Sequence, residues 1–176
     1  MSQKETTQSG AAIDLAAGKS FDEFTGSRGL RDVRLSVGFE RAVKEFGKVT
    51  LVMFADMGCP DCLAVLPFLG RIKDAGPEIS VVFGEWNAAS EKFLQDRLGT
   101  GRVPTVLALD ASGKLMDGTF IERPLGVHRS VAEASSRKDA MIAIGRFRNG
   151  GDDALIEEDL LKVLRGEKND VLRYLK

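Results

Sequence analysis

Apolar positions along the middle of the chain alternate between the spacing of helices and the short runs of buried strands. Apolar residues recur at helical spacing within 31–46, and the apolar run 49–55 that follows is typical of a buried strand. A helix is expected over residues 60–73 and a second strand over 78–84. Helical and strand segments therefore follow one another in this part of the chain.

A shorter helix and a β-hairpin are predicted next. Ser90 can cap a helix that ends at residue 98, because a serine side chain can accept a backbone N–H of the first helical turn. The apolar segments 105–109 and 114–122 are separated by the turn sequence Asp-Ala-Ser-Gly. This pattern favours two paired strands.

The last third of the chain is predicted to be helical. Residues 130–133 have the Ser-x-x-Glu pattern of a capping box, which predicts a helix start, and the Asn-Gly-Gly run 149–151 predicts its end. The Arg-Phe-Arg run 146–148 before this stop is expected to be a solvated helix end. Asp152 or Asp153 can then cap a last amphipathic helix.

Composition and charge narrow the class of protein. The chain has 176 residues, of which 43% are hydrophobic, so it can bury a sizeable core without disulfide staples. The formal net charge of −1 gives no electrostatic reason to expect nucleic acid or an anionic membrane as a partner. Residues 1–28 are mostly polar, lack the apolar core of a secretory signal and are expected to be a flexible tail. No later segment resembles a membrane span.

Both cysteines of the chain lie in one run, Cys59-Pro60-Asp61-Cys62, directly after the expected strand 49–55. Two thiols at this spacing can form a disulfide when the backbone between them makes the first turn of a helix. Pro60 suits the first helical position, which places Cys59 at the helix N-terminus. The helix dipole stabilises a thiolate there, so the run predicts a dithiol redox site.

Asp61 introduces an opposing electrostatic effect. Its charge lies one residue from each cysteine and disfavours a second negative charge on either sulfur. Pro60 and Asp61 are therefore the residues expected to tune the stability of the thiolate. Because the carboxylate destabilises the thiolate that a strong oxidant needs, a reducing or intermediate potential is expected.

Two other interpretations of the cysteine pair stay open. A Cys-x-x-Cys pair can be half of a zinc site, but zinc needs four ligands, and the chain has one histidine, His128, and no second cysteine pair. The cysteines can also be ordinary core thiols, because free cysteine is often buried. Neither interpretation explains why both cysteines fall where a strand meets a helix. No metal site is expected.

The order of the elements resembles the thioredoxin superfamily over residues 31–149. Two further features support the resemblance. Val103-Pro104 stands where the family has a cis-proline before a strand, and Pro67 stands where the active-site helix of the family is kinked. The resemblance implies an α/β protein with a thioredoxin-like fold, in which helices flank a mixed central sheet and extra helices follow at the C-terminus.

The resemblance also implies a division of the chain. Residues 1–28 are expected to be the flexible tail, 29–149 the thioredoxin-like domain, and 150–176 a C-terminal helical extension packed on the same domain. The final helices exceed the usual thioredoxin length. In this the chain is similar to a group of bacterial thioredoxin-like proteins with a helical extension.

Three positions depart from the family pattern. Gly58 precedes the first cysteine where tryptophan is usual, and Pro-Asp replaces Gly-Pro between the cysteines. Met53 stands where the family has a buried aspartate that relays a proton to the second cysteine. Asp56, three residues further on, is a candidate to replace that aspartate.

The mechanism implied by the resemblance is thiol exchange in two steps. Cys59 as a thiolate attacks a disulfide, and the more buried Cys62 then attacks Cys59 and releases the reduced substrate. The backbone at Val103 and Pro104 is expected to pair with an extended substrate. Gly58 either leaves the rim of the site open or only makes the loop flexible. No metal, nucleotide or flavin cofactor is required.

The expected function is that of a cytoplasmic thiol–disulfide oxidoreductase, with disulfide reduction as the expected direction. Protein or low-molecular-weight disulfides are the expected substrates, and an electron donor such as a reductase is the expected second partner. The alternative is a redox-sensing or chaperone-like interaction protein, in which the Cys59–Cys62 disulfide switches the binding of a partner.

Overall fold

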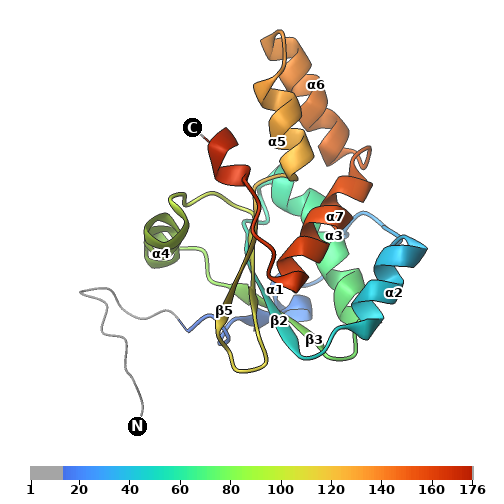
Figure 1. Cartoon of the computed structure of the whole chain (residues 1–176), viewed down its shortest axis with the longest axis vertical. Helices are drawn as coiled ribbons and strands as arrows, with labels where there is room; N and C mark the ends of the chain where they lie inside the picture. The colour runs from blue at the N-terminus through green and yellow to red at the C-terminus, as the bar shows by residue number, and fades with distance from the viewer. Residues whose placement is uncertain (1–13, 176) are drawn as a thin grey trace.

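A mixed five-stranded sheet forms the centre of the structure, a computed structural model that describes residues 14–175 (Figure 1). The strands are β1 (Lys19–Ser20), β2 (Val49–Phe54), β3 (Ile79–Gly84), β4 (Thr105–Leu109) and β5 (Leu115–Ile121). Their order in the sheet is β1-β3-β2-β4-β5. Strands β2 and β3 are parallel, and the other neighbouring pairs are antiparallel. The expected mixed α/β sheet is confirmed.

Helices cover both faces of this sheet. In the described residues they are α1 (Phe21–Thr25), α2 (Val37–Glu45), α3 (Pro60–Ala75), α4 (Ala88–Leu98), α5 (Leu125–Ala132), α6 (Arg137–Arg148), α7 (Asp153–Arg165) and the 3-10 turn η1 (Val171–Tyr174). Figure 1 shows α4 on one side of the sheet and α2, α3 and α7 on the other. The sheet is therefore the middle layer of three.

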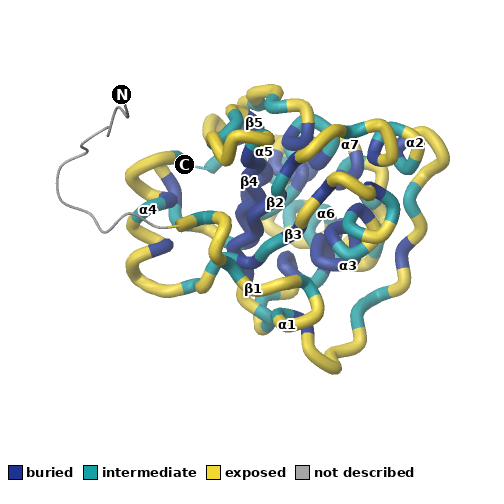
Figure 2. Tube along the Cα trace, turned by 90° about the horizontal axis from the view of Figure 1, so that it is seen from below, coloured by how far each residue is buried: buried dark blue, intermediate teal, exposed yellow. Residues whose placement is uncertain are grey.

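The two faces of β2 belong to different hydrophobic clusters. Leu51 and Met53 face the larger cluster with α3 and α7, whereas Val52 and Phe54 face the smaller cluster with Leu94 of α4. Side chains of a strand alternate between its faces, so every second residue enters the same cluster. All of these strand residues are fully buried. Figure 2 shows the central strands and α3 in dark blue, surrounded by exposed turns.

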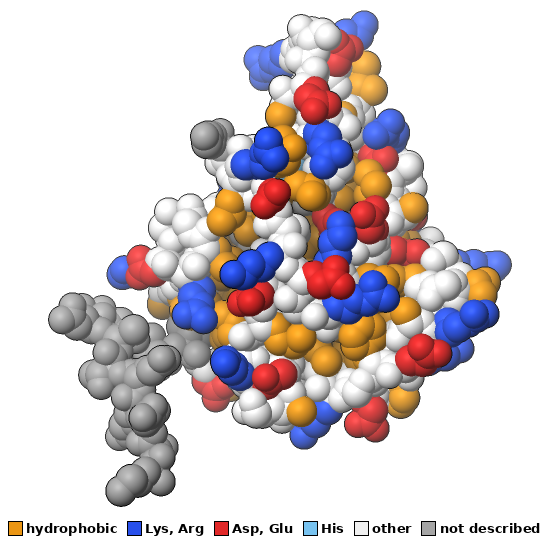
Figure 3. Space-filling model, in the orientation of Figure 1, with side chains coloured by type: hydrophobic (Ala, Val, Ile, Leu, Met, Phe, Trp, Pro, Cys, Tyr) orange, Lys and Arg blue, Asp and Glu red, His pale blue; other side chains and the backbone are white. Residues whose placement is uncertain are grey.

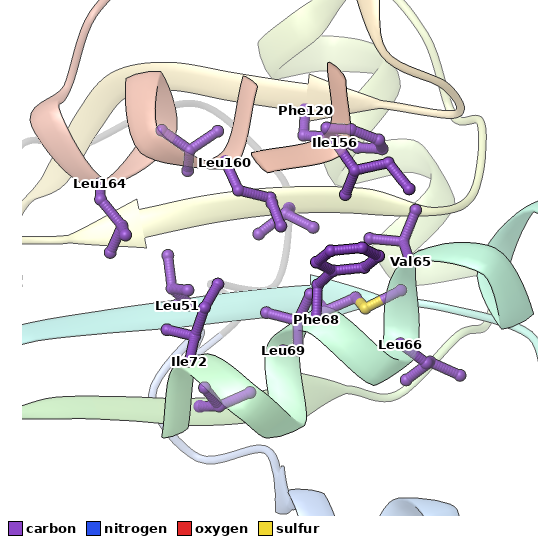
Figure 4. Close-up of a cluster of buried hydrophobic side chains, with 14 of the residues drawn as sticks. Leu51, Val65, Leu66, Phe68, Leu69, Ile72, Phe120, Ile156, Leu160 and Leu164 are labelled. Atoms are coloured by element: carbon purple, nitrogen blue, oxygen red, sulfur yellow. The ribbon is translucent and has the colours of Figure 1, made fainter. Parts of the chain in front are cut away.

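Helix α7 is part of the larger core. Its apolar side chains lie against α3 and the sheet in Figure 4. The residues that meet there come from β2, α3, β5 and α7, namely Leu51, Phe68, Leu69, Ile72, Phe120, Ile156, Leu160 and Leu164. The C-terminal helix thus stabilises the same domain as the cysteine-bearing helix.

Residues 19–25 do not form the flexible tail that we expected. Strand β1 pairs with β3, and the Ser20 side chain caps α1 by accepting the Glu23 N–H, while the Glu23 carboxylate accepts the Ser20 N–H. The ring of Phe24 stacks on that of Phe83 with centroids 4.3 Å apart. The aromatic contact gives this otherwise polar segment a place on the sheet edge. The expected tail residues 1–13 lie outside the described residues.

The helix expected to begin at residues 130–133 is instead two helices. Helix α5 begins after Pro124, and the Ser130 hydroxyl donates to the Gly126 carbonyl within it. The chain then turns, and the Ser136 side chain caps α6 by accepting the Asp139 N–H. The capping-box prediction was wrong because a proline at the N-cap already sets the start of the helix, upstream of the serine.

Two other helix starts also differ from the prediction, and a third lacks the side-chain cap that we expected. Helix α2 begins after Ser36, because the Ser36 side chain accepts the Phe39 N–H. Helix α4 begins one turn earlier than expected, because Asn87 caps it. Asp152 precedes α7 as expected, but its carboxylate pairs with Arg146 instead of capping the helix. Among the described residues, the structure has no helix that is both long and apolar enough to cross a membrane.

Candidate functional site

The chain between β2 and α3 places Cys59 at the N-terminus of α3. The Asp56 carboxylate accepts the Gly58 N–H at 2.8 Å, and the Asp56 carbonyl accepts the Cys59 N–H at 3.0 Å. These bonds turn the backbone after the strand, and Pro60 then occupies the first helical position. Cys59 is thereby the N-cap residue, as the position of the proline indicated.

The two thiols differ in exposure. Cys59 is half-buried, whereas Cys62, one helical turn later, is completely buried, and both are free thiols. Burial raises the pKa of the Cys62 thiol well above its ordinary value. The Asp56 N–H, which lies 3.4 Å from the Cys62 sulfur, opposes this effect. Cys59 is thus the more accessible thiol, and Cys62 is the buried thiol whose protonated form is favoured.

The peptide bond between Val103 and Pro104 is cis, as the resemblance implied. It lies just before β4, and the Thr105 hydroxyl donates to the Arg102 carbonyl at 2.7 Å. The Pro104 carbonyl accepts the Glu122 N–H at 2.6 Å. Val103 packs against both hydrophobic clusters. Hydrogen bonds to Thr105 and to Glu122 thus fix the segment before β4.

Gly58 lies at the turn immediately before the cysteine pair. A Cβ atom at this position would lie 3.3 Å from the Asp56 carboxylate oxygen that accepts the Gly58 N–H. This approach is tight but leaves room for adjustment of the carboxylate. A side chain at residue 58 would therefore press on the turn that presents Cys59.

Asp61 is buried and paired with two arginines. Its side chain is 4% exposed, its Oδ1 lies 2.6 Å from Arg148 Nε, and its Oδ2 lies 2.8 Å from Arg123 Nη2. A buried carboxylate is costly unless such partners satisfy it. We expected its charge to disfavour a second negative charge on either sulfur. The structure shows a charge held in an ion-pair cluster.

Further ion pairs extend the cluster toward the cis-proline. Arg123 Nη2 also lies 3.0 Å from Glu122 Oε1, and Arg102 Nη1 lies 2.7 Å from Glu122 Oε2. Glu122 has a positive φ of 65°, a conformation that is uncommon for a residue with a side chain. Five charged side chains thus connect α3, the segment before β4, the end of β5 and the end of α6.

Arg148 contradicts the expectation of a solvated helix end at residues 146–148. Phe147 is completely buried, and Arg148 crosses to Asp61, which is 87 residues away in sequence. Hydrogen bonding to Asp61 raises the pKa of Arg148, and the nearby Cys59 adds to this effect. No local pattern in the sequence indicated this pairing, because its two halves belong to elements far apart in the chain.

Three other residues considered in the sequence, Met53, Asp56 and His128, differ in their burial. Met53 is completely buried in β2, and the Asp56 side chain is exposed in the turn before Cys59. His128 is buried in α5, with Nε2 2.8 Å from the Ile121 carbonyl oxygen, and burial lowers the pKa of His128. Within residues 14–175, no three His, Cys, Asp or Glu side chains form a group able to hold a metal ion.

A hollow of about 500 Å³ borders the turn before Cys59. Ala55, Asp56 and Met57 line one side, and Phe24, Phe83 and Trp86 are among the residues that line the other. The hollow opens at the carboxyl ends of the parallel strands β2 and β3, the edge of an α/β sheet where ligands commonly bind.

The cysteine pair at a helix start and the cis-proline before β4, on a mixed sheet of this order, agree with the family comparison. A family model described as Thioredoxin matches residues 27–136, which is more than half of the chain. The chain therefore belongs to the thioredoxin family. No curated protein sequence matches it significantly.

Solved structures extend the likeness in fold. A crystal structure of a protein of unknown function from Pseudomonas aeruginosa has a TM-score of 0.67 and 22% sequence identity, over 90% of this chain and 98% of the other. The crystal structure of an HIV epitope-scaffold has a TM-score of 0.59 and 21% identity, over 90% and 99% of the two chains. Both matches cover more of the chain than the family model does, and at these identities they show the fold alone.

Proposed function

We propose that the protein is a thiol–disulfide oxidoreductase that reduces protein or low-molecular-weight disulfides in the cytoplasm. The observation that carries this proposal is the half-buried Cys59 at the N-terminus of α3, with the fully buried Cys62 one turn behind it. An unidentified electron donor, such as a reductase, would restore the dithiol. The thioredoxin family supports a redox-related role in general.

The first step of the proposed reaction is the attack of the Cys59 thiolate on a substrate disulfide. The substrate S–S bond breaks, a Cys59–substrate disulfide forms, and the leaving thiolate takes up a proton from solvent. The N-terminus of α3 favours the negative charge on Cys59. The backbone at Val103 would pair with an extended substrate beside the sulfur, and Gly58 would leave its approach open.

The second step converts the two cysteines of the site into a disulfide. Cys62 loses its proton and attacks the Cys59 sulfur, which forms the Cys59–Cys62 bond and releases the second substrate thiol. Two electrons pass to the substrate in total, and the donor must replace them. The raised pKa of Cys62 keeps this thiol protonated until Cys59 has reacted, and the Asp56 N–H stabilises the thiolate that then forms.

The test is substrate trapping combined with turnover. Wild-type protein is expected to accelerate the reduction of insulin by dithiothreitol, and Cys59→Ser is expected to abolish this activity. Cys62→Ser is expected to accumulate mixed disulfides at Cys59, because the resolving thiol is missing. Mass spectrometry of the trapped adducts identifies the substrate. Turnover that persists in Cys59→Ser would refute the proposal.

An exposed apolar pair favours a second candidate function. Met141 and Ile142 of α6 are 52% and 59% exposed. The α5–α6 hairpin projects from the sheet in Figure 1, and the same projection carries hydrophobic side chains at its surface in Figure 3. Such a hairpin suits a redox-sensing or chaperone-like interaction protein whose disulfide switches partner binding. Redox-dependent binding at a fixed stoichiometry, without turnover, would favour this candidate over the enzyme.

A further inference from the structure

Asp61 is a buried carboxylate in the first turn of α3, two residues after Cys59. Asp61 is the second residue of α3, and its side chain is 4% exposed. Little water screens a charge at such a position. Without compensation, this carboxylate would offset the favourable effect of the helix N-terminus on the Cys59 sulfur. The redox site therefore depends on what neutralises Asp61.

Arg148 is the partner dedicated to this task. Its Nε lies 2.6 Å from Asp61 Oδ1, and among residues 14–175 its ion pairing involves Asp61 alone. Arg123, in contrast, divides one nitrogen between Asp61 and Glu122. The five charged groups of the cluster are three arginines and two carboxylates, so the cluster carries one net positive charge with Arg148 and none without it.

Arg148 belongs to the helical region that follows the sheet. It is the last residue of α6, whose end lies above the start of α3 in Figure 1. Phe147 beside it is completely buried in the large core and fixes this end of the helix. The charged and titratable groups around the Cys59 end of α3 are Arg28, Asp56, Asp61, Cys62, Arg102, Glu122, Arg123 and Arg148.

We propose that Arg148 is a positioning residue of the redox site: it holds and neutralises the Asp61 carboxylate, so that this charge does not oppose a thiolate on Cys59 while the end of α6 is docked on α3. The helices after the sheet thereby complete the site. This inference rests on the proposed function, but its test measures alkylation of Cys59 and does not require enzymatic turnover. Besides the hydrogen bond to Asp61, the charge of Cys59 raises the pKa of Arg148, which agrees with an electrostatic interaction between the two side chains.

The test measures the alkylation rate of reduced Cys59 against pH, in a Cys62→Ser background in which Cys59 is the sole thiol. Arg148→Gln removes the charge and keeps a side chain of similar length. The alkylation rate at neutral pH is expected to fall about threefold to tenfold, because the thiolate loses a compensating charge. At a pH where the thiol is fully ionised, the rate is expected to equal that of the parent protein.

A matched control on the same helix is Arg146→Gln. Arg146 is also an arginine paired with an aspartate, but its partner is Asp152 at the start of α7. Its rate profile is expected to coincide with that of the parent. An equal loss of rate in both variants would show a general effect of loosening α6 and would overturn the proposal.

A double substitution distinguishes charge from folding. Asp61→Asn is expected to accelerate alkylation at neutral pH, because it removes the opposing charge, and Asp61→Asn with Arg148→Gln is expected to return close to the parent rate. Arg148→Lys keeps the charge, and an intermediate rate is expected if the folded state is retained. Unchanged rates in folded Arg148→Gln and Arg148→Lys proteins would refute the role of Arg148. Failure of insulin reduction with these alkylation results intact would reject the proposed function alone.

Discussion

Helix α7 and the α5–α6 hairpin both follow the sheet in sequence, but they are attached to it in different ways. α7 places Ile156, Leu160 and Leu164 in the large core, all at most 1% exposed. In α6, Phe147 is the buried residue, and half of the residues of the helix are exposed. Helix α7 therefore contributes more to the core than α6 does, and the end of α6 brings Arg148 to the cysteine-bearing helix.

The polar contacts of α7 and of the α5–α6 hairpin also differ. Glu157 of α7 accepts the Ser36 N–H at 2.7 Å and the Ser36 hydroxyl at 2.6 Å, and so ties α7 to the start of α2. Asp159 of α7 accepts the Leu125 N–H at the start of α5. These carboxylates hold structural elements together. Arg148 of the hairpin instead pairs with Asp61 of α3, which stands between the two cysteines in sequence.

The largest expected effect breaks the attachment of α7. Leu160→Ala removes a completely buried side chain and is expected to lower the free energy of unfolding by about 2–5 kcal/mol, through lost burial and the cavity left behind. Met141→Ala in the hairpin, where the side chain is 52% exposed, is expected to change it by less than about 0.5 kcal/mol. Urea unfolding of both variants measures the contrast. Comparable losses would contradict the division between α7 and the hairpin.

A smaller effect is expected from the polar anchor of α7. Glu157→Gln leaves one of the two Ser36 donors facing an amide N–H₂ group, and a loss of about 1–3 kcal/mol in the free energy of unfolding is expected. Glu158→Gln is the matched control, because Glu158 is adjacent but exposed and pairs with Lys162. It is expected to cost at most about 0.5 kcal/mol. Equal costs at both positions would show that the Ser36 contact adds no stability.

Local patterns were sufficient to predict the parts of the molecule whose residues are close in sequence. Strand β2 and helix α3 begin where the apolar runs and Pro60 indicated, and the Cys-x-x-Cys motif lies between them. These features depend on hydrogen bonds and turns within a few residues. The cis peptide before Pro104 was expected from the family resemblance, because an X-Pro sequence alone gives no such indication.

Predictions failed where distant contacts decide the structure. The polar composition before residue 28 gave no sign that Phe24 stacks on Phe83 of β3. The pairing of Asp61 with Arg148 joins side chains that are 87 residues apart, and an arginine at a helix end is usually solvated. Periodicity reports which face of a segment is apolar. It does not report which charged side chain of another segment meets it.

The smallest expected effect concerns His128, which connects α5 to the turn that carries Arg123. Its Nε2 lies 2.8 Å from the Ile121 carbonyl oxygen and 3.3 Å from the Arg123 backbone nitrogen, and burial lowers the pKa of the ring below its ordinary value of 6.5. The unfolded chain therefore takes up a proton at a higher pH than the folded protein does. The stability contributed by neutral His128 is present above about pH 6.5 and is lost as the pH falls toward the lower folded-state pKa.

The variant His128→Gln isolates this contribution, because its amide can still donate to the Ile121 carbonyl but does not titrate. At about pH 7.5 the variant is expected to be less stable than wild type by about 1 kcal/mol, the value of an ordinary hydrogen bond with altered geometry. The difference is expected to narrow as the pH falls below the ordinary histidine range, since only wild type then loses stability by this route. Urea unfolding of both proteins across this range measures it. A difference that widens on acidification would show that the folded protein holds His128 protonated, and that the ring stabilises the Arg123 turn as a cation.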